Sequence, residues 1–182
     1  MSRISMPALD QTPAATLPLL DAVRKQLGLV PNLMKVVGNS PAALGGYLAL
    51  GGALAKGALG AKTGERIALA IAEINACGYC LAAHTYLGRN VAKLDDAEIA
   101  TNRNGASNDP KADAAVRFAA RVALERGHVS DTAVRAVKDA GYSDAEVMEI
   151  VAHVALNTLT NYVNEVAQTE IDFPAVDLKR AA

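Results

Sequence analysis

Apolar residues recur with helical spacing along almost the whole chain. Ile67, Ile71 and Ile74, for example, are spaced i, i+4 and i+7 and therefore share one face of a helix. Strict alternation of apolar and polar residues, which is typical of a half-buried strand, hardly occurs. The pattern predicts an all-α fold.

Glycine, proline and capping residues divide the chain into separate helices. Ser40 followed by Pro41 is a strong helix start, and Thr63 is expected to cap the next long helix. Gly28 and Gly88 are expected to end two others. The predicted helices span about 17–27, 32–38, 41–54, 63–75, 77–87, 95–100, 111–126, 130–140 and 143–168, and an irregular tail follows from about 170.

The composition supports helices over strands. Of the 182 residues, 37 are Ala, which is the best helix former, whereas strands favour β-branched and aromatic side chains. Hydrophobic residues make up 51% of the chain, so intrinsic disorder is excluded. The length is that of one domain, and we expect a single helical domain over residues 1–182.

The charge balance excludes several kinds of partner. Lys and Arg number 18 and Asp and Glu 19, which gives a net charge of -1 and favours neither nucleic acid nor an anionic membrane. The expected helix within the uncharged residues 41–55 contains four glycines and is shorter than the roughly 18–20 apolar residues of a membrane helix. No apolar segment follows Arg3 as it would in an export signal. We therefore expect a soluble, cytoplasmic protein.

The only two cysteines, Cys77 and Cys80, form a Cys-x-x-Cys pair. A bridge between them would close a very short loop and stabilise the fold by only about 2 kcal/mol in the chain-entropy model. The pair therefore indicates redox chemistry or metal binding, since it would be a poor structural staple in a cytosolic protein.

His84 follows the pair at a spacing that suits catalysis. On one helix, separations of three and four residues place Cys77, Cys80 and His84 on a single face. Asn75 is expected to cap this helix, so that free backbone N–H groups near its start favour a thiolate. An ordinary thiol, with a pKa of about 8.5, needs such help at neutral pH, and His84 is placed to accept the proton.

A histidine base is normally oriented by a carboxylate, and Glu65 is the candidate. It lies near the start of the preceding helix, over the small residues Ala68 and Ala72, which leave room for a neighbouring side chain. The alternative is that Glu65 is an ordinary solvated residue at a helix start.

Other interpretations of these residues stay open. Cys77, Cys80 and His84 would supply only part of the four-ligand shell of zinc, and His128 and His153 have no ligand partner at familiar spacing. The cysteines are also small enough to be core residues. A polar stripe in the last helix predicts a buried hydrogen-bond ladder or a subunit contact; it comprises His153, Asn157, Thr160, Asn161 and Asn164.

The chain contains Glu65, then eleven residues, and then Cys77-x-x-Cys80-x-x-x-His84. This arrangement resembles the core motif of the alkylhydroperoxidase D family, within the carboxymuconolactone decarboxylase-like superfamily. The resemblance covers about residues 40–88, the core motif region, with a weaker echo at 161–164. Gly78 and Tyr79 between the cysteines are common in the peroxidase-related branch of the family.

The resemblance implies an all-helical fold that assembles into homotrimers or homohexamers and reduces hydroperoxides without a cofactor. By the same resemblance Cys80 attacks the peroxide, Cys77 resolves it into a disulfide, and His84 with Glu65 form a proton relay. The reductant would be a lipoyl-type or thioredoxin-type dithiol. Some family members carry a second histidine where this chain has Tyr79, a poor base at neutral pH, which predicts a shorter relay.

Two alternatives to a peroxidase remain from the sequence. The cysteine pair could serve a general disulfide reductase, or a non-catalytic oligomer that only responds to redox state. The decarboxylase branch of the superfamily does not use this cysteine pair, so the presence of the pair argues against that activity.

Overall fold

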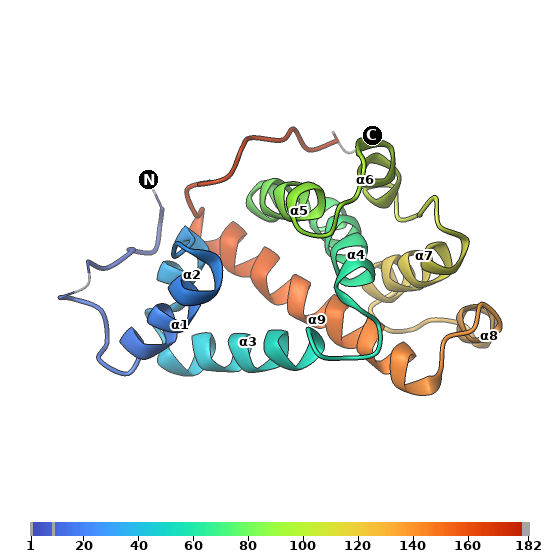
Figure 1. The fold of residues 1–182 in the computed structure, drawn as a ribbon, viewed down its shortest axis with the longest axis horizontal. Coiled ribbons are helices and arrows are strands. Elements are labelled where there is room, and N and C mark those ends of the chain that lie inside the picture. The colour runs from blue at the N-terminus through green and yellow to red at the C-terminus, as the bar shows by residue number, and fades with distance from the viewer. Residues whose placement is uncertain (1, 9, 180–182) are drawn as a thin grey trace.

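The computed structural model describes residues 2–8 and 10–179. Over this part of the chain it contains nine α-helices and no strand, which confirms the all-α prediction (Figure 1). The helices are α1 (Leu17–Leu27), α2 (Asn32–Val37), α3 (Pro41–Leu54), α4 (Ala61–Ile74), α5 (Gly78–Asn90), α6 (Asp96–Asn102), α7 (Pro110–Leu124), α8 (Asp131–Asp139) and α9 (Asp144–Ala167).

Two predicted helix boundaries are wrong. Helix α4 starts before Thr63, because Gly60 has a φ of 78°, a conformation that favours glycine and turns the chain into the helix two residues earlier. Helix α5 continues past Gly88 to Asn90. Gly88 is not an end signal here but a buried helical residue that lies beside the side chains of Leu94 and Ile99.

Helix α4 lies at the centre of the molecule, between α5, α7 and α9 (Figure 1). Its predicted stripe packs as expected: Ile67 and Ile71 are fully buried, and Ile74 packs beside them against α7 and α9. A second apolar cluster joins α4 to α1, α2, α3 and α5 and contains both cysteines. No helix in the described part of the chain is long and apolar enough to cross a membrane.

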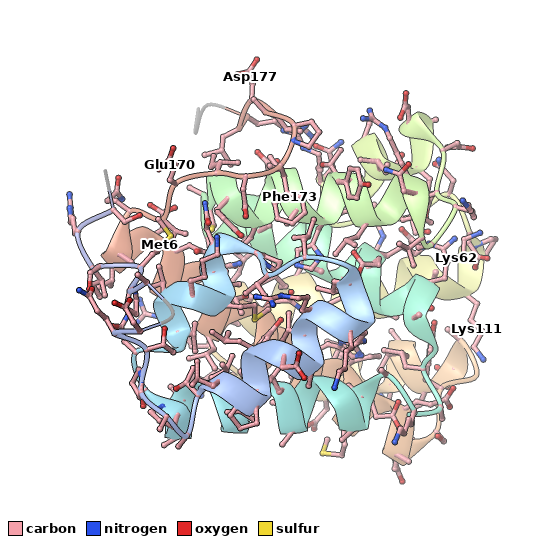
Figure 2. The ribbon with its side chains drawn as sticks, turned by 60° about the vertical axis from the view of Figure 1, so that its left-hand side comes forward. Met6, Lys62, Lys111, Glu170, Phe173 and Asp177 are labelled. Atoms are coloured by element: carbon pink, nitrogen blue, oxygen red, sulfur yellow. The ribbon has the colours of Figure 1, made fainter. Side chains whose placement is uncertain are left out.

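Residues 169–179, here called the C-terminal strap, run along α5 toward α6 (Figure 1). The carboxylate of Asp172 holds the strap by accepting hydrogen bonds from the Tyr79 hydroxyl and the Asn32 N–H, each at 2.8 Å. Further along, Arg103 donates to the carbonyl oxygen of Asp177 at 2.7 Å. Figure 2 shows Phe173 on the strap, where its ring packs edge-on against Tyr79.

Candidate active site

A tight turn between α4 and α5 positions the two cysteines. Ala76 adopts a positive φ of 51°, and Cys77 then serves as the N-cap of α5, its Sγ accepting the N–H of Cys80 at 3.4 Å. The expected Asn75 cap is therefore wrong, because the turn at Ala76 delays the start of the helix by two residues. Cys77 lies just outside the helix and not on its face, yet it stays in contact with Cys80.

Helix α9 supplies polar partners to this turn. The Asn164 side chain donates to Cys80 Sγ at 3.2 Å, and Thr160 Oγ1 lies 4.0 Å from the same sulfur. The Asn75 side chain donates to Asn161 Oδ1 at 2.9 Å, which fixes the turn against α9. Because Cys80 is only 2% exposed, these contacts replace water around its sulfur.

The surroundings give the two thiols opposite acidities. The hydrogen bond from the Cys77 side chain, the positive charge of His84 and the Asn164 donor together lower the pKa of Cys80 to about 6, although burial acts against them. The pKa of Cys77 is raised, first by its hydrogen bond to Cys80 and then by burial. At neutral pH the site therefore contains a Cys80 thiolate beside a Cys77 thiol.

Glu65 and His84 meet across the α4–α5 interface, with Glu65 Oε2 2.9 Å from His84 Nδ1. Their side chains are 22% and 20% exposed, so the pair is partly screened from water. Burial favours a neutral His84, but the charge of Glu65, its hydrogen bond and the nearby Cys80 outweigh it and raise the pKa of His84. The structure therefore joins all four residues of the motif in one cluster.

Tyr79 is one of the two residues between the cysteines, and its hydroxyl forms hydrogen bonds with other parts of the fold. Its hydroxyl accepts the N–H of Leu33 at 3.1 Å and donates to Asp172 at 2.8 Å. Burial raises the pKa of this phenol further above its ordinary value. Tyr79 therefore anchors α2 and the strap to α5 and takes no part in the His84–Glu65 pair.

A cavity of about 540 Å³ opens beside this cluster, with Cys80, His84 and Glu65 in its wall. Most of the remaining wall is apolar and comes from α1, α2, α3, α4, α5, α9 and the strap, with Leu48 and Phe173 among its residues. No Lys, Arg or Asp side chain of the described residues lines it. Nor do residues 2–8 and 10–179 contain a group of His, Cys, Asp and Glu side chains that could hold a metal ion.

Sequence reasoning did not assign Asn164 and Thr160 to the site. The polar stripe of α9 was visible, and Asn157, Thr160, Asn161 and Asn164 are buried as one of its two interpretations expects, but their side chains bond to main-chain carbonyls, Asn75 and Cys80 and do not form a ladder among themselves. What the stripe could not reveal is that its end faces Cys80. His153, at the start of the stripe, lines the cavity beside Gly64. Sequence reasoning also missed Tyr47, for which the sequence carries no signal.

Comparisons with known proteins agree with this architecture. Residues 41–125 match the model of the carboxymuconolactone decarboxylase family. A peroxidase-related protein from Ralstonia eutropha JMP134, described as an alkylhydroperoxidase AhpD core, is 26% identical to this chain, with a TM-score of 0.83 over 94% of this chain and 92% of that one. No curated protein sequence matches the chain.

More distant structures share the fold. A peroxidase-related protein from Silicibacter sp. TM1040 is 22% identical, with a TM-score of 0.81 over 93% of this chain and 91% of that one. The debrominase Bmp8, solved as a variant in complex with 2,3,4-tribromopyrrole, is 18% identical, with a TM-score of 0.71 over 92% of this chain and 94% of that one. The chain thus matches the carboxymuconolactone decarboxylase family over residues 41–125 and is similar in fold to a structure described as an alkylhydroperoxidase AhpD core.

Proposed function

We propose that the protein is a thiol-dependent peroxidase that reduces organic hydroperoxides through Cys80 and Cys77. The observation that carries this proposal is the geometry of Cys80, which lies in the cavity wall, in contact with Cys77 and Asn164 and one turn from the His84–Glu65 pair; its lowered pKa agrees with this geometry. A thiolate that is accessible from a cavity and adjacent to a resolving thiol is the arrangement that peroxide reduction needs. The mainly apolar wall of the cavity suits a hydroperoxide with an apolar substituent.

In the first step the Cys80 thiolate attacks the distal, hydrogen-bearing oxygen of the hydroperoxide. A sulfur–oxygen bond forms while the oxygen–oxygen bond breaks, so the sulfur is oxidised to a sulfenic acid and the peroxide is reduced. The proximal oxygen leaves as an alkoxide and takes a proton from protonated His84, whose raised pKa is maintained by Glu65.

In the second step Cys77 attacks the sulfur of the Cys80 sulfenic acid. A disulfide forms, the sulfur–oxygen bond breaks, and the leaving hydroxide takes the Cys77 proton as water. An external dithiol then returns two electrons and two protons and restores both thiols. The first cause of the raised Cys77 pKa is its hydrogen bond to Cys80, so we expect oxidation of Cys80 to remove this cause and to let Cys77 resolve the sulfenic acid beside it.

We also propose that the protein acts as a homotrimer or homohexamer. Helix α9 supports this proposal, because several large apolar side chains on it are exposed in the single chain; they are Met148, Val151, Leu159, Tyr162 and Val166. Exposed apolar surface of this kind is typical of a subunit contact.

The deciding experiment measures the consumption of cumene hydroperoxide with dihydrolipoamide as the reductant, and again with thioredoxin. We expect repeated turnover by the wild type and none by Cys80→Ser. Oxidation of one disulfide per chain without turnover by any dithiol would contradict the proposal and favour a redox-responsive oligomer. Equal reduction of unrelated disulfides, without peroxide consumption, would indicate a general disulfide reductase.

A further inference from the structure

Tyr47 extends into the cavity from α3. Leu44, Tyr47 and Leu48 follow one another at helical spacing on the face of α3 that points inward, and Leu44 is completely buried. Tyr47 packs against the apolar cluster that contains Cys77 and Cys80 and lines the cavity together with Cys80.

The hydroxyl of Tyr47 is free to bind a ligand. No group within residues 2–8 and 10–179 forms a hydrogen bond with it, whereas the hydroxyl of Tyr79 is fully used. Burial, followed by the negative charges of Cys80 and Glu65, raises the pKa of Tyr47 to about 12. Tyr47 therefore remains a hydrogen-bond donor at every working pH.

We propose that Tyr47 is a catalytic residue that donates a hydrogen bond to the proximal oxygen of the hydroperoxide bound at Cys80. This role rests on the proposed peroxidase function and adds a donor to it. The proximal oxygen carries almost no charge in the substrate but becomes negative as the oxygen–oxygen bond breaks, so a fixed donor stabilises the transition state more than the ground state.

The division of labour with His84 follows from their acidities. His84 supplies the proton that the departing alkoxide keeps, since its pKa is raised from a value near neutrality. Tyr47 holds its own proton throughout and contributes only the hydrogen bond. Its contribution must therefore depend on how basic the leaving oxygen is: it is large for an alkoxide and small for a carboxylate.

The test compares Tyr47→Phe with the wild type on two oxidants. Cumene hydroperoxide releases an alkoxide, whereas peracetic acid releases acetate, a far weaker base. The rate of disulfide formation in the reduced protein is measured by quenched-flow mass spectrometry. We expect Tyr47→Phe to react about 10- to 100-fold more slowly with cumene hydroperoxide and within about threefold of the wild type with peracetic acid.

Tyr142→Phe is the matched control. Tyr142 is a buried tyrosine that packs in the apolar cluster of α4, α7, α8 and α9 and does not line the cavity. We expect this variant to match the wild type on both oxidants. Circular dichroism and thermal melting of both variants verify that the fold is intact, which we expect since each change removes a single oxygen atom.

Three results would overturn the role of Tyr47. The first is an unchanged rate of Tyr47→Phe with cumene hydroperoxide. The second is an equal loss on both oxidants. The third is a rise in the Cys80 pKa, measured from the pH dependence of alkylation, that accounts for the lost rate, because Tyr47 would then act on the thiolate and not on the leaving oxygen. Failure of the wild type itself to react with either oxidant would instead refute the peroxidase function.

Discussion

Cys77 and Cys80 lie three residues apart at the start of α5, and that difference in position separates their chemistry. Cys77 is the N-cap, and its sulfur accepts the N–H of Cys80, whereas Cys80 lies in the first turn against α9 and one turn from His84. Proximity to the helix start alone would favour Cys77 as the anion. The polar partners around Cys80 outweigh it, since only Cys80 has a lowered pKa.

These unequal environments predict different products from the two serine variants. In Cys77→Ser, peroxide is expected to convert Cys80 to a sulfenic acid that persists, because no neighbouring thiol resolves it. In Cys80→Ser, Cys77 is expected to remain a thiol under the same conditions. Trapping with dimedone and mass spectrometry distinguishes the two. A sulfenic acid found on Cys77, and never on Cys80, would reverse the assignment.

The Asn164 side chain is predicted to contribute to the acidity of Cys80. Removing this donor in Asn164→Ala should raise the pKa of Cys80 by roughly one unit, since a hydrogen bond to a charged group is worth about 1.5–3 kcal/mol and part of that is recovered by water. The pH dependence of iodoacetamide alkylation measures this shift.

Asn157→Ala is the matched control for Asn164→Ala. Asn157 lies two turns earlier on α9, and its amide donates to the His153 carbonyl oxygen instead of to the sulfur. The wild-type midpoint is expected near pH 6, and Asn157→Ala should keep it. An unchanged midpoint in Asn164→Ala would show that the Asn164 contact has no effect on the thiolate.

At the scale of elements, one buried carboxylate joins α4 to α6 and the following loop. Glu98 accepts hydrogen bonds from Arg66 Nε at 2.7 Å, Asn102 Nδ2 at 3.0 Å, Ser107 Oγ at 2.5 Å and the Asn108 N–H at 2.7 Å. Burial opposes ionisation, but these donors outweigh it and lower the pKa of Glu98 to about 2. Arg66 directly follows Glu65 in α4, so the network holds the turn of α4 that also carries Glu65.

This network predicts a pH-dependent stability. Because the pKa of Glu98 in the folded state is below its ordinary value of 4.5, its contribution is fully present above about pH 4.5 and is lost as the pH falls toward 2. We expect Glu98→Gln to lower the free energy of unfolding at pH 7 by about 2–3 kcal/mol, with a smaller difference from the wild type at pH 3.

Asp96→Asn provides the control for Glu98→Gln. It removes the exposed ion pair with Arg89, in which the Asp96 side chain is 76% exposed, and should change stability by less than about 1 kcal/mol. Urea unfolding at both pH values gives the comparison. An equal effect of Glu98→Gln at pH 7 and pH 3 would contradict the electrostatic explanation.

The sequence predicts most helices of this fold, because each helix carries its own apolar periodicity and most carry their own caps. The predicted helix boundaries are wrong at two kinds of position. At Gly88 tertiary packing keeps the chain helical past a glycine, and at Gly60 a glycine with positive φ starts the helix earlier than the sequence indicates. The motif from Glu65 to His84 is local enough to be recognised from spacing. Asn164 and Tyr47 could not be assigned, because only the packing of α9 and α3 brings them to Cys80.

At the scale of the whole molecule, the exposed apolar side of α9 bears on the proposed assembly. Replacing Val166, which is 64% exposed, by Glu would place a charge within the proposed subunit contact. We expect Val166→Glu to reduce the mass in solution from that of the oligomer to that of a single chain. Light scattering after size-exclusion chromatography measures it.

Leu124→Glu is the matched control for Val166→Glu. Leu124 is 67% exposed on α7 and is not part of the exposed apolar side of α9, so an added charge there should leave the assembly unchanged. A wild-type protein that is already a single chain in solution would contradict the oligomer. An equal effect of both variants would show that α9 is not the contact.

The position of α9 also determines when a newly made chain becomes reactive. Asn164 lies 84 residues after Cys80 and Asn161 lies 86 residues after Asn75, so the ribosome releases the cysteine pair long before these partners exist. Until α9 docks, the thiols are exposed to water, without the Asn164 donor and without one wall of the cavity. We therefore expect the proposed peroxide chemistry to depend on the docking of α9, so that a translation product truncated before α9 carries the whole motif but only a weakened form of its reactivity.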